Sequence, residues 1–141
     1  MKGKKTILCV DSNEQALSIR KVILETHGYR VQTATNAAAA LPLFQAGGVD
    51  LVLADLTLTD TDGARLIEQI KAQSPHTPAI LFSNRVRIYE RETCADVFLP
   101  KGAYSPAEVL ERIRHLLARK RGPRRIPASQ AAPGAARIGV A

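Results

Sequence analysis

The sequence predicts an α/β protein in which five parallel strands form one sheet that is covered by helices on both faces. Short apolar runs alternate along the chain with segments whose apolar residues recur at helical spacing, and turn-forming residues separate them. Several of these runs end on acidic or small polar residues, which is typical of buried strands that deliver side chains to the carboxyl edge of a parallel sheet. The 141 residues, 45% of them hydrophobic, are enough for one domain with a buried core.

The first strand is predicted at residues 6–10, a partly β-branched apolar run that ends on Asp11. Ser12 or Asn13 can cap the helix that follows, and Gly28 is a candidate for the residue that ends it. The apolar positions of this helix are Leu17, Val22, Ile23 and Leu24. Polar and apolar residues alternate over residues 29–35, which predicts a second strand near an edge of the sheet.

Asn36 is predicted to cap an alanine-rich helix that ends at Gly47 and Gly48. Pro42 lies well inside this helix and has no N–H to donate, so we expect a kink or a shortened helix there.

The central strand is predicted from Val49 to Asp55, because a continuous apolar run ends there on one carboxylate and gives way to Thr, Asp and Gly. A strand-end aspartate is ambiguous by itself: it can cap the loop, or it can react. The helix after this loop is predicted at about residues 64–72 and has apolar residues at helical spacing, namely Leu66, Ile67 and Ile70.

A fourth buried strand is predicted at residues 79–82, and it ends on Ser83 and Asn84. Residues 85–96 are polar and weakly periodic, which predicts a short helix, and residues 97–100 form a fifth strand that is followed at once by Lys101. Ser105, Pro106 and Glu108 match the start of a last helix, with serine as its cap and proline at its first position. This helix is expected to bury Val109, Leu110, Ile113, Leu116 and Leu117.

Charge divides the chain at about residue 118. All 13 acidic residues precede this point, whereas six of the 20 basic ones follow it. We therefore predict a domain over residues 1–118 and a basic, disordered tail over residues 119–141. The tail has no interleaved aromatic residues to stack on bases, which argues against nucleic-acid binding.

The cysteine content and the lack of long apolar runs indicate the cellular compartment. The two cysteines, Cys9 and Cys94, form no spaced framework, so reduced thiols are expected. No apolar run reaches the roughly 18 residues of a membrane span, and the start of the chain does not resemble a signal peptide. We expect a cytoplasmic protein without a membrane partner.

The predicted strand ends bring together Asp11, Asp55, Ser83 and Lys101. Clustered carboxylates bind a hard divalent cation such as Mg²⁺, and this cation together with a lysine can neutralise a phosphoryl group. A serine hydroxyl can donate a hydrogen bond to a phosphoryl oxygen. The chemistry that suits this set is attack by an aspartate carboxylate on phosphorus, which gives an aspartyl phosphate.

These residues, in this order, resemble the receiver domain of bacterial two-component response regulators over about residues 5–118. The resemblance implies a flavodoxin-like fold with strand order 2-1-3-4-5. It implies that Asp55 is the phosphoacceptor, that Asp11, Asp55 and the backbone carbonyl of Thr57 hold Mg²⁺, and that Lys101 pairs with the phosphoryl group. Ser83 would bind the same group, and Phe98 would be the aromatic partner of Ser83 in the family's switch.

The sequence departs from the family pattern at several positions. The second of two adjacent acids after the first strand is replaced by Ser12, which removes a metal ligand and predicts weaker Mg²⁺ binding unless Glu14 or water substitutes. Gly102 stands where a proline usually follows the lysine, so the loop there should be looser. Milder changes are Leu58-Thr59 in place of Met-Pro, Asn84 in place of a smaller residue, and a shortened segment between Ser83 and Lys101.

Two functions remain open from the sequence. The first is a stand-alone receiver that accepts a phosphoryl group on Asp55 from a histidine kinase or phosphotransfer protein and signals through a protein contact, as a monomer or a phosphorylation-linked dimer. The alternative is a degenerate pseudo-receiver that binds partners independently of phosphate. We expect no enzyme beyond self-catalysed aspartyl phosphorylation, since a haloacid-dehalogenase-like phosphatase needs an Asp where Thr57 stands.

Overall fold

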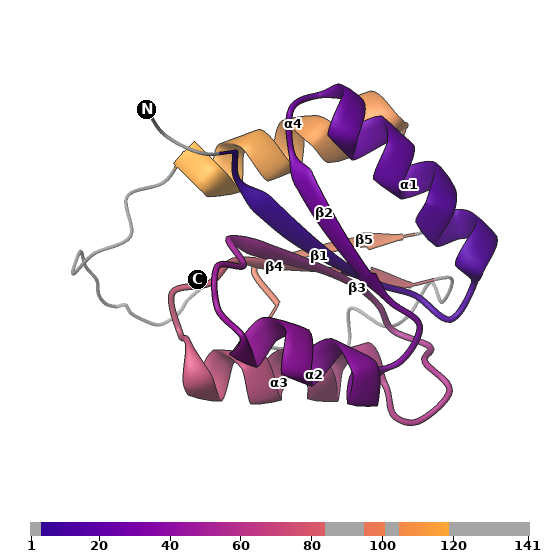
Figure 1. Cartoon of the computed structure of the whole chain (residues 1–141), viewed down its shortest axis with the longest axis vertical. Helices are drawn as coiled ribbons and strands as arrows, with labels where there is room; N and C mark the ends of the chain where they lie inside the picture. The colour runs from indigo at the N-terminus through magenta and orange to yellow at the C-terminus, as the bar shows by residue number, and fades with distance from the viewer. Residues whose placement is uncertain (1–3, 84–94, 101–104, 119–141) are drawn as a thin grey trace.

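The computed structural model describes residues 4–83, 95–100 and 105–118. These residues form a five-stranded parallel sheet in the order β2-β1-β3-β4-β5, which confirms the predicted fold (Figure 1). The strands are β1 (Thr6–Val10), β2 (Arg30–Ala34), β3 (Leu51–Asp55), β4 (Ala79–Ser83) and β5 (Val97–Pro100). Strand β2 lies at the edge, as its alternating pattern predicted, and β3, which is buried over its whole length, lies at the centre.

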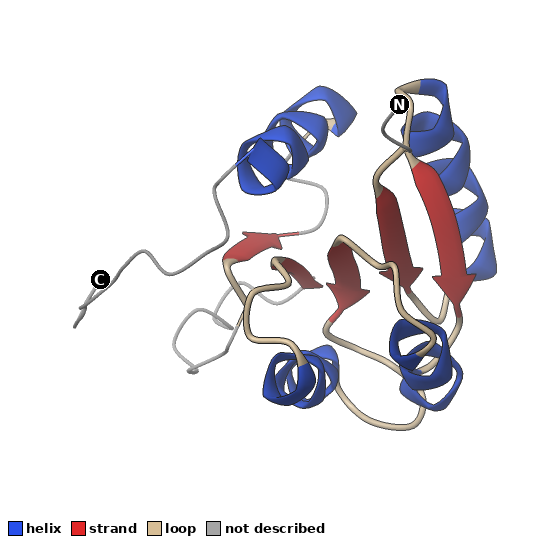
Figure 2. Cartoon of the chain, turned by 60° about the vertical axis from the view of Figure 1, so that its left-hand side comes forward, coloured by secondary structure: helices blue, strands red, loops and turns tan. Residues whose placement is uncertain are grey.

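Four helices cover the sheet within the described ranges: α1 (Glu14–Thr26), α2 (Ala37–Gln45), α3 (Gly63–Gln73) and α4 (Pro106–Ala118). Helices α1 and α4 lie on one face, and α2 and α3 lie on the other (Figures 1 and 2). Each face has its own apolar cluster, since successive strand residues point to opposite sides of the sheet. None of the described helices is long and apolar enough to cross a membrane.

Side-chain caps set where the helices begin. Asn13, rather than Ser12, caps α1 by accepting a hydrogen bond of 3.0 Å from the Ala16 N–H. Asn36 caps α2 as predicted. Ser105 and Glu108 form a reciprocal capping box at α4, in which each side chain accepts a hydrogen bond from the other residue's N–H.

Helix ends differ slightly from the sequence prediction. The C-cap of α1 is His27, and Gly28 follows it with a φ of 95°, a left-handed conformation that glycine adopts without strain. Helix α2 continues past Pro42 for three residues and ends at Gln45, so it is short, with nine residues. The helix ends just before Gly47, whose φ of 95° is a left-handed conformation that does not continue a helix.

The buried residues of α1 agree with the prediction at Leu17 and Leu24 but not at Val22. Leu17 and Leu24 are buried, whereas Val22 is 63% exposed and Ile19 is 58% exposed. The position that falls between Leu17 and Leu24 on the inner side is occupied by Arg20, which is three residues after Leu17 and four before Leu24. In α4, Ile113 and Leu116 are buried as predicted, and the other three predicted apolar residues are half-buried.

Several predictions lie outside the described residues. These are the positions of Asn84, Lys101 and Gly102, most of the short helix predicted at 85–96, and the basic tail from 119 onward. The division of the chain into a domain over 1–118 and a tail over 119–141 therefore stays a prediction.

Candidate functional site

Three buried polar residues meet at the carboxyl edge of the sheet. Strand β3 lies between β1 and β4, and the register pairs Val10 with Ala54 and Asp55 with Phe82. Asp11 and Asp55 therefore end neighbouring strands at the same level, and Ser83 ends the next strand. Their exposed fractions are only 1% for Asp11, 5% for Asp55 and 1% for Ser83. The structure thus places these three predicted site residues at the same edge of the sheet, at the ends of neighbouring strands.

Asp11 is held by the start of α1. Its Oδ1 atom accepts a hydrogen bond of 2.9 Å from the N–H of Asn13, and its own N–H donates to the carbonyl of Ala34 on β2. Its Oδ2 atom lies 3.6 Å from Nη1 of Arg20. The carboxylate is thus fixed by the backbone on one side and paired with a cation on the other.

Sequence reasoning missed Arg20. Its guanidinium carbon lies 5.0 Å from the centre of the Phe82 ring, and its side chain is only 19% exposed. A cation over an aromatic face is favourable, and the ring also shields the charge from water. The available signal was its position on the helical stripe of Leu17 and Leu24, where an apolar residue would be expected.

The loop after Asp55 folds back on itself at Gly63. The N–H of Gly63 donates a hydrogen bond of 2.7 Å to the carbonyl of Leu56, and the N–H of Leu56 donates one of 2.7 Å to the carbonyl of Phe82. Thr57 and Asp62 form an isolated antiparallel bridge within the loop. This closed loop fixes the backbone of Thr57, whose carbonyl was predicted as a metal ligand.

Asp60 ties the same loop to α2. Its two carboxylate oxygens accept hydrogen bonds of 3.1 Å from the N–H of Ala37 and 2.9 Å from that of Ala38. These bonds, the one from Ala37 first, lower the pKa of Asp60 below its ordinary value of 3.8. The carboxylate therefore caps the first turn of α2 across 23 residues of sequence, beside the local cap Asn36.

Replacing Asp60 by asparagine should lower the thermal midpoint of unfolding at neutral pH, because a neutral amide accepts these bonds less strongly and complements the helix N-terminus less well. A carboxyl whose folded pKa is lowered stabilises the fold above its unfolded pKa, and this contribution is lost as the pH falls through the folded pKa. The difference in thermal midpoint between wild type and Asp60→Asn should therefore become smaller below about pH 4.

Calorimetric scans from neutral pH to pH 3 would check this, with the exposed α3 residue changed in Glu68→Gln as the control. A gap that stays constant over this range would contradict the assignment.

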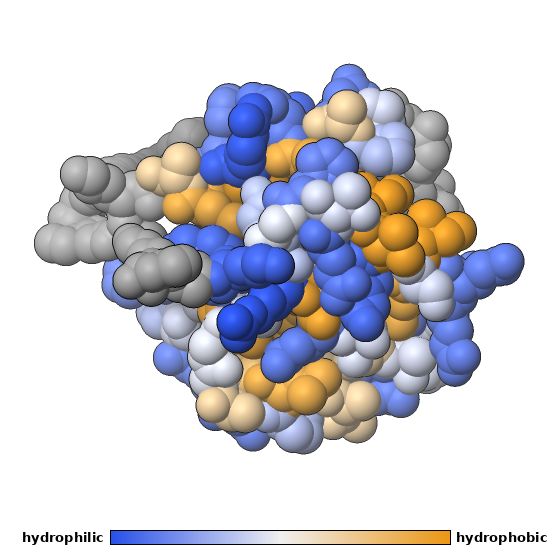
Figure 3. Space-filling view, turned by 45° about the horizontal axis from the view of Figure 1, so that its top comes forward, coloured by the Kyte–Doolittle hydropathy of each residue, from blue (hydrophilic) through white to orange (hydrophobic). Residues whose placement is uncertain are grey.

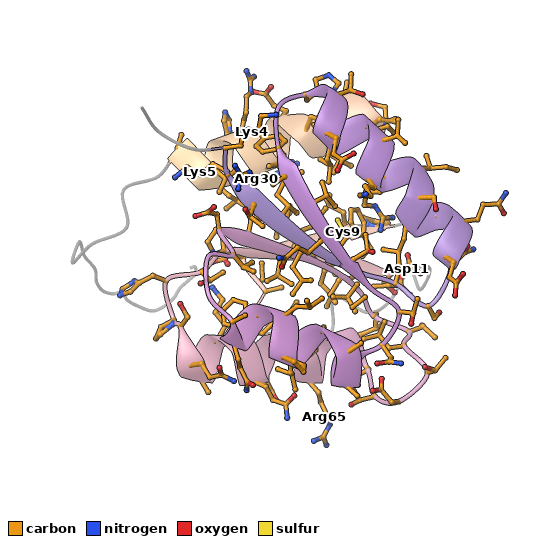
Figure 4. The ribbon with its side chains drawn as sticks, viewed as in Figure 1. Lys4, Lys5, Cys9, Asp11, Arg30 and Arg65 are labelled. Atoms are coloured by element: carbon orange, nitrogen blue, oxygen red, sulfur yellow. The ribbon has the colours of Figure 1, made fainter. Side chains whose placement is uncertain are left out.

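Cys9 lies two residues before Asp11, on the α1 side of β1 (Figure 4). The thiol is free and fully buried, and burial raises its pKa to about 12 against the opposing effect of the Arg20 charge. A thiol in this state is not a nucleophile near neutral pH. Cys9 is therefore a core residue with a free thiol, whereas Cys94 lies outside the described residues.

Phe98 lies on the other face of the sheet from Arg20. It pairs in register with Leu81, two residues before Ser83, and it is half-buried against the cluster that α2 and α3 cover. Ser83 and Phe98 belong to adjacent strands, and their coupling stays a prediction. Lys101, the last of the predicted site residues, is outside the described ranges.

The oxygen donors of this site suit a hard cation, although only two of them are carboxylates. Carboxylates of Asp11 and Asp55 and the carbonyl of Thr57 are oxygen ligands of the kind that Mg²⁺ takes. Residues 4–83, 95–100 and 105–118 contain no group of three or more His, Cys, Asp or Glu side chains that could hold a metal ion. Ser12 is exposed at the edge of the site, and Glu14 is exposed in the first turn of α1.

The doubly wound parallel sheet presents an acid after its first strand, an acid at the end of its third and a hydroxyl at the end of its fourth, at the edge where such sheets bind their ligands. The family model described as the response regulator receiver domain matches residues 7–114. The chain belongs to this family.

Two curated relatives are transcriptional regulators. The chain is 29% identical over 119 residues to the alkaline phosphatase synthesis transcriptional regulatory protein PhoP of Bacillus subtilis, with 82% of this chain and 49% of that protein covered. It is 28% identical over 117 residues to the transcriptional regulatory protein TrcR of Mycobacterium tuberculosis, with 80% and 45% covered. The chain thus spans about half the length of these relatives.

Solved structures show the same fold. A CheY-like response regulator receiver domain protein from Methanospirillum hungatei superposes with a TM-score of 0.76 at 28% identity, covering 82% of this chain and 94% of that one. The response regulator protein TrrA of Thermotoga maritima, solved in complex with Mg²⁺-BeF, gives a TM-score of 0.75 at 26% identity, with 79% and 98% covered.

Proposed function

We propose that this receiver accepts a phosphoryl group on Asp55 from a phosphohistidine of a histidine kinase or phosphotransfer protein. The observation that carries the proposal is the placement of the Asp55 carboxylate, 5% exposed, at the end of the central strand between Asp11 and Ser83. A carboxylate oxygen of Asp55 would form a bond to phosphorus while the bond from phosphorus to the histidine nitrogen breaks, with its electron pair going to the imidazole.

The remaining groups would organise this transfer. Asp11, Asp55 and the Thr57 carbonyl would hold Mg²⁺, which when bound neutralises charge on the phosphoryl oxygens. Ser83 would donate a hydrogen bond to one of these oxygens, and Lys101 would pair with another. The Mg²⁺-BeF complex of TrrA supports this assignment by similarity. The chain would promote its own phosphorylation and would not turn over a substrate.

The output would be a protein contact that depends on the phosphorylation state. Ser83 and Phe98, on neighbouring strands, would carry the change from the site to the surface near β5. We place this activity in the cytoplasm, where kinase and receiver meet, and expect either a monomer or a phosphorylation-linked dimer.

Transfer of phosphate tests the proposal directly. The full chain is incubated with Mg²⁺ and a small phosphodonor such as phosphoramidate, and intact-mass spectrometry follows the acyl phosphate. The added mass of a phosphoryl group is expected on wild type and on Asp60→Asn, the control, in which only the carboxylate that caps α2 is removed. It should be absent from Asp55→Asn. Absence of label on wild type, or label that persists on Asp55→Asn, would refute phosphorylation at this residue.

A second candidate is the phosphate-independent pseudo-receiver. Its supporting observations are that the acid is replaced by the exposed Ser12 and that the carboxylate of Asp11 is paired with Arg20. An unlabelled wild-type protein whose fold and partner binding are unchanged in Asp55→Asn would favour this function over the first.

A further inference from the structure

Arg20 reaches across the acidic site from α1. It contacts Asp11, which follows β1, and its guanidinium lies over the ring of Phe82 on β4. Strand β3 lies between these two strands, and Asp55 is the register partner of Phe82. A group that contacts both outer strands from the α1 side must therefore lie over the carboxyl end of the strand between them.

The Asp55 side chain belongs to this same side of the sheet. Leu51 and Leu53, which precede it at alternating positions of β3, pack in the cluster under α1 and α4, as do Cys9 and Phe82. Side chains two residues apart on a strand share a face. The guanidinium of Arg20 is thus a positive charge in the space that Asp11 and Asp55 border.

We propose that Arg20 is a built-in cation of this site, which competes with a divalent cation for the Asp11 carboxylate and thereby sets the Mg²⁺ concentration at which the site fills. The inference deepens the proposed function and rests on its assignment of the metal ligands. Arg20 is a positioning residue here, since it acts through Asp11. Its planar guanidinium can hold the carboxylate edge and the aromatic face together, which a lysine ammonium cannot do in the same way.

Two physical effects make the competition substantial. The ion pair is shielded from water, with the arginine side chain 19% exposed and the aspartate side chain 1% exposed, so screening is weaker than at the surface. The entering cation carries two positive charges and would meet a third within the same small space, unless the arginine turns away and gives up both Asp11 and Phe82.

The surroundings of α1 offer a matched control. Lys21 is the next residue along the helix, is half-exposed, and pairs with Glu25 across one helical turn. Arg65 on α3 points away from the sheet on its far side (Figure 4). Figure 3 looks toward the face from which α1 and α4 come forward, and it shows hydrophilic residues mixed with hydrophobic ones there.

Mg²⁺ titration of the full chain, followed by amide chemical shifts at constant ionic strength, tests the proposal without any phosphodonor. Arg20→Gln should bind Mg²⁺ on the order of tenfold more tightly than wild type. Arg20→Lys should lie between the two, and Lys21→Gln and Arg65→Gln should match wild type. Thermal scans give a second readout: Mg²⁺ should raise the melting temperature of Arg20→Gln more than that of wild type, because a cation that binds the folded state more tightly stabilises it more at the same concentration.

Equal or weaker Mg²⁺ binding by Arg20→Gln would overturn the proposal, as would equal tightening in Lys21→Gln, which would mean that net charge alone is responsible. The result is separable from the proposed function. Tighter binding by Arg20→Gln in a protein that no phosphodonor labels would uphold the role of Arg20 and refute phosphorylation.

Discussion

Replacing Gly63 by alanine should destabilise the protein by about 3 kcal/mol or more, because there is no room for a β-carbon at this position. A Cβ atom at residue 63 would lie 2.2 Å from the carbonyl oxygen of Asp55 and 2.9 Å from its carbonyl carbon. These are backbone atoms of the central strand and cannot rotate aside as a side chain would. Either α3 shifts away from the sheet, or the end of β3 does, and the Gly63 N–H would lose its bond to Leu56.

Urea unfolding followed by circular dichroism measures this loss. Gly47→Ala is the matched control, because Gly47 has a φ of 95° but nothing lies within 4 Å of the position that its Cβ would take. It should cost only about 1 kcal/mol, the penalty of a left-handed conformation. If Gly63→Ala were no less stable than Gly47→Ala, the close approach of α3 to the end of β3 would be wrong.

Replacing Ser12 by aspartate should strengthen Mg²⁺ binding on the order of tenfold or more, since a further carboxylate adds a charged oxygen ligand to the pair formed by Asp11 and Asp55. Ser12 is exposed and directly follows Asp11 at the end of β1, so the new carboxylate borders the site without entering the core. Asn13, which caps α1, is left unchanged. We also expect a lower melting temperature without the cation, because three carboxylates then repel one another.

The measurement is the same amide-shift titration with Mg²⁺, and Ser12→Asn is the control, because it adds similar bulk without charge. Tighter binding by Ser12→Asp alone is expected. Equal binding by all three proteins would show that residue 12 does not face the cation. It would contradict the assignment of position 12 as the place of a further acidic ligand.

The strands and their ends could be predicted from the sequence because local signals agree there. Most of the apolar runs end on a polar residue. Because the strands are parallel, these polar residues all lie at the carboxyl edge of the sheet. The cap of α4 was equally predictable, since Ser105 and Glu108 lie within one turn of each other. Shorter strand bounds than predicted, such as Leu51 in place of Val49 for β3, reflect where the neighbouring strands begin to pair.

What escaped prediction depends on contacts between elements. Val22 was expected in the core, yet it is exposed, because the rotation of α1 on the sheet is set by Leu17 and Leu24 and turns Arg20 inward instead. An arginine on the inner side of a helix cannot be predicted to be stable there unless an aspartate and an aromatic ring are known to face it. The contact of Asp60 with α2 is equally invisible in the sequence, since nothing local indicates a cap from 23 residues away.

The bond between Asp60 and α2 also has a consequence for motion. The loop of residues 56–62 supplies two of the acceptors that keep the first turn of α2 wound, so the loop cannot swing outward without releasing the N–H groups of Ala37 and Ala38. Opening of the loop and fraying of α2 are then one event with one free-energy cost. A disturbance beside Thr57 would reach the first turn of α2 through the carboxylate of Asp60.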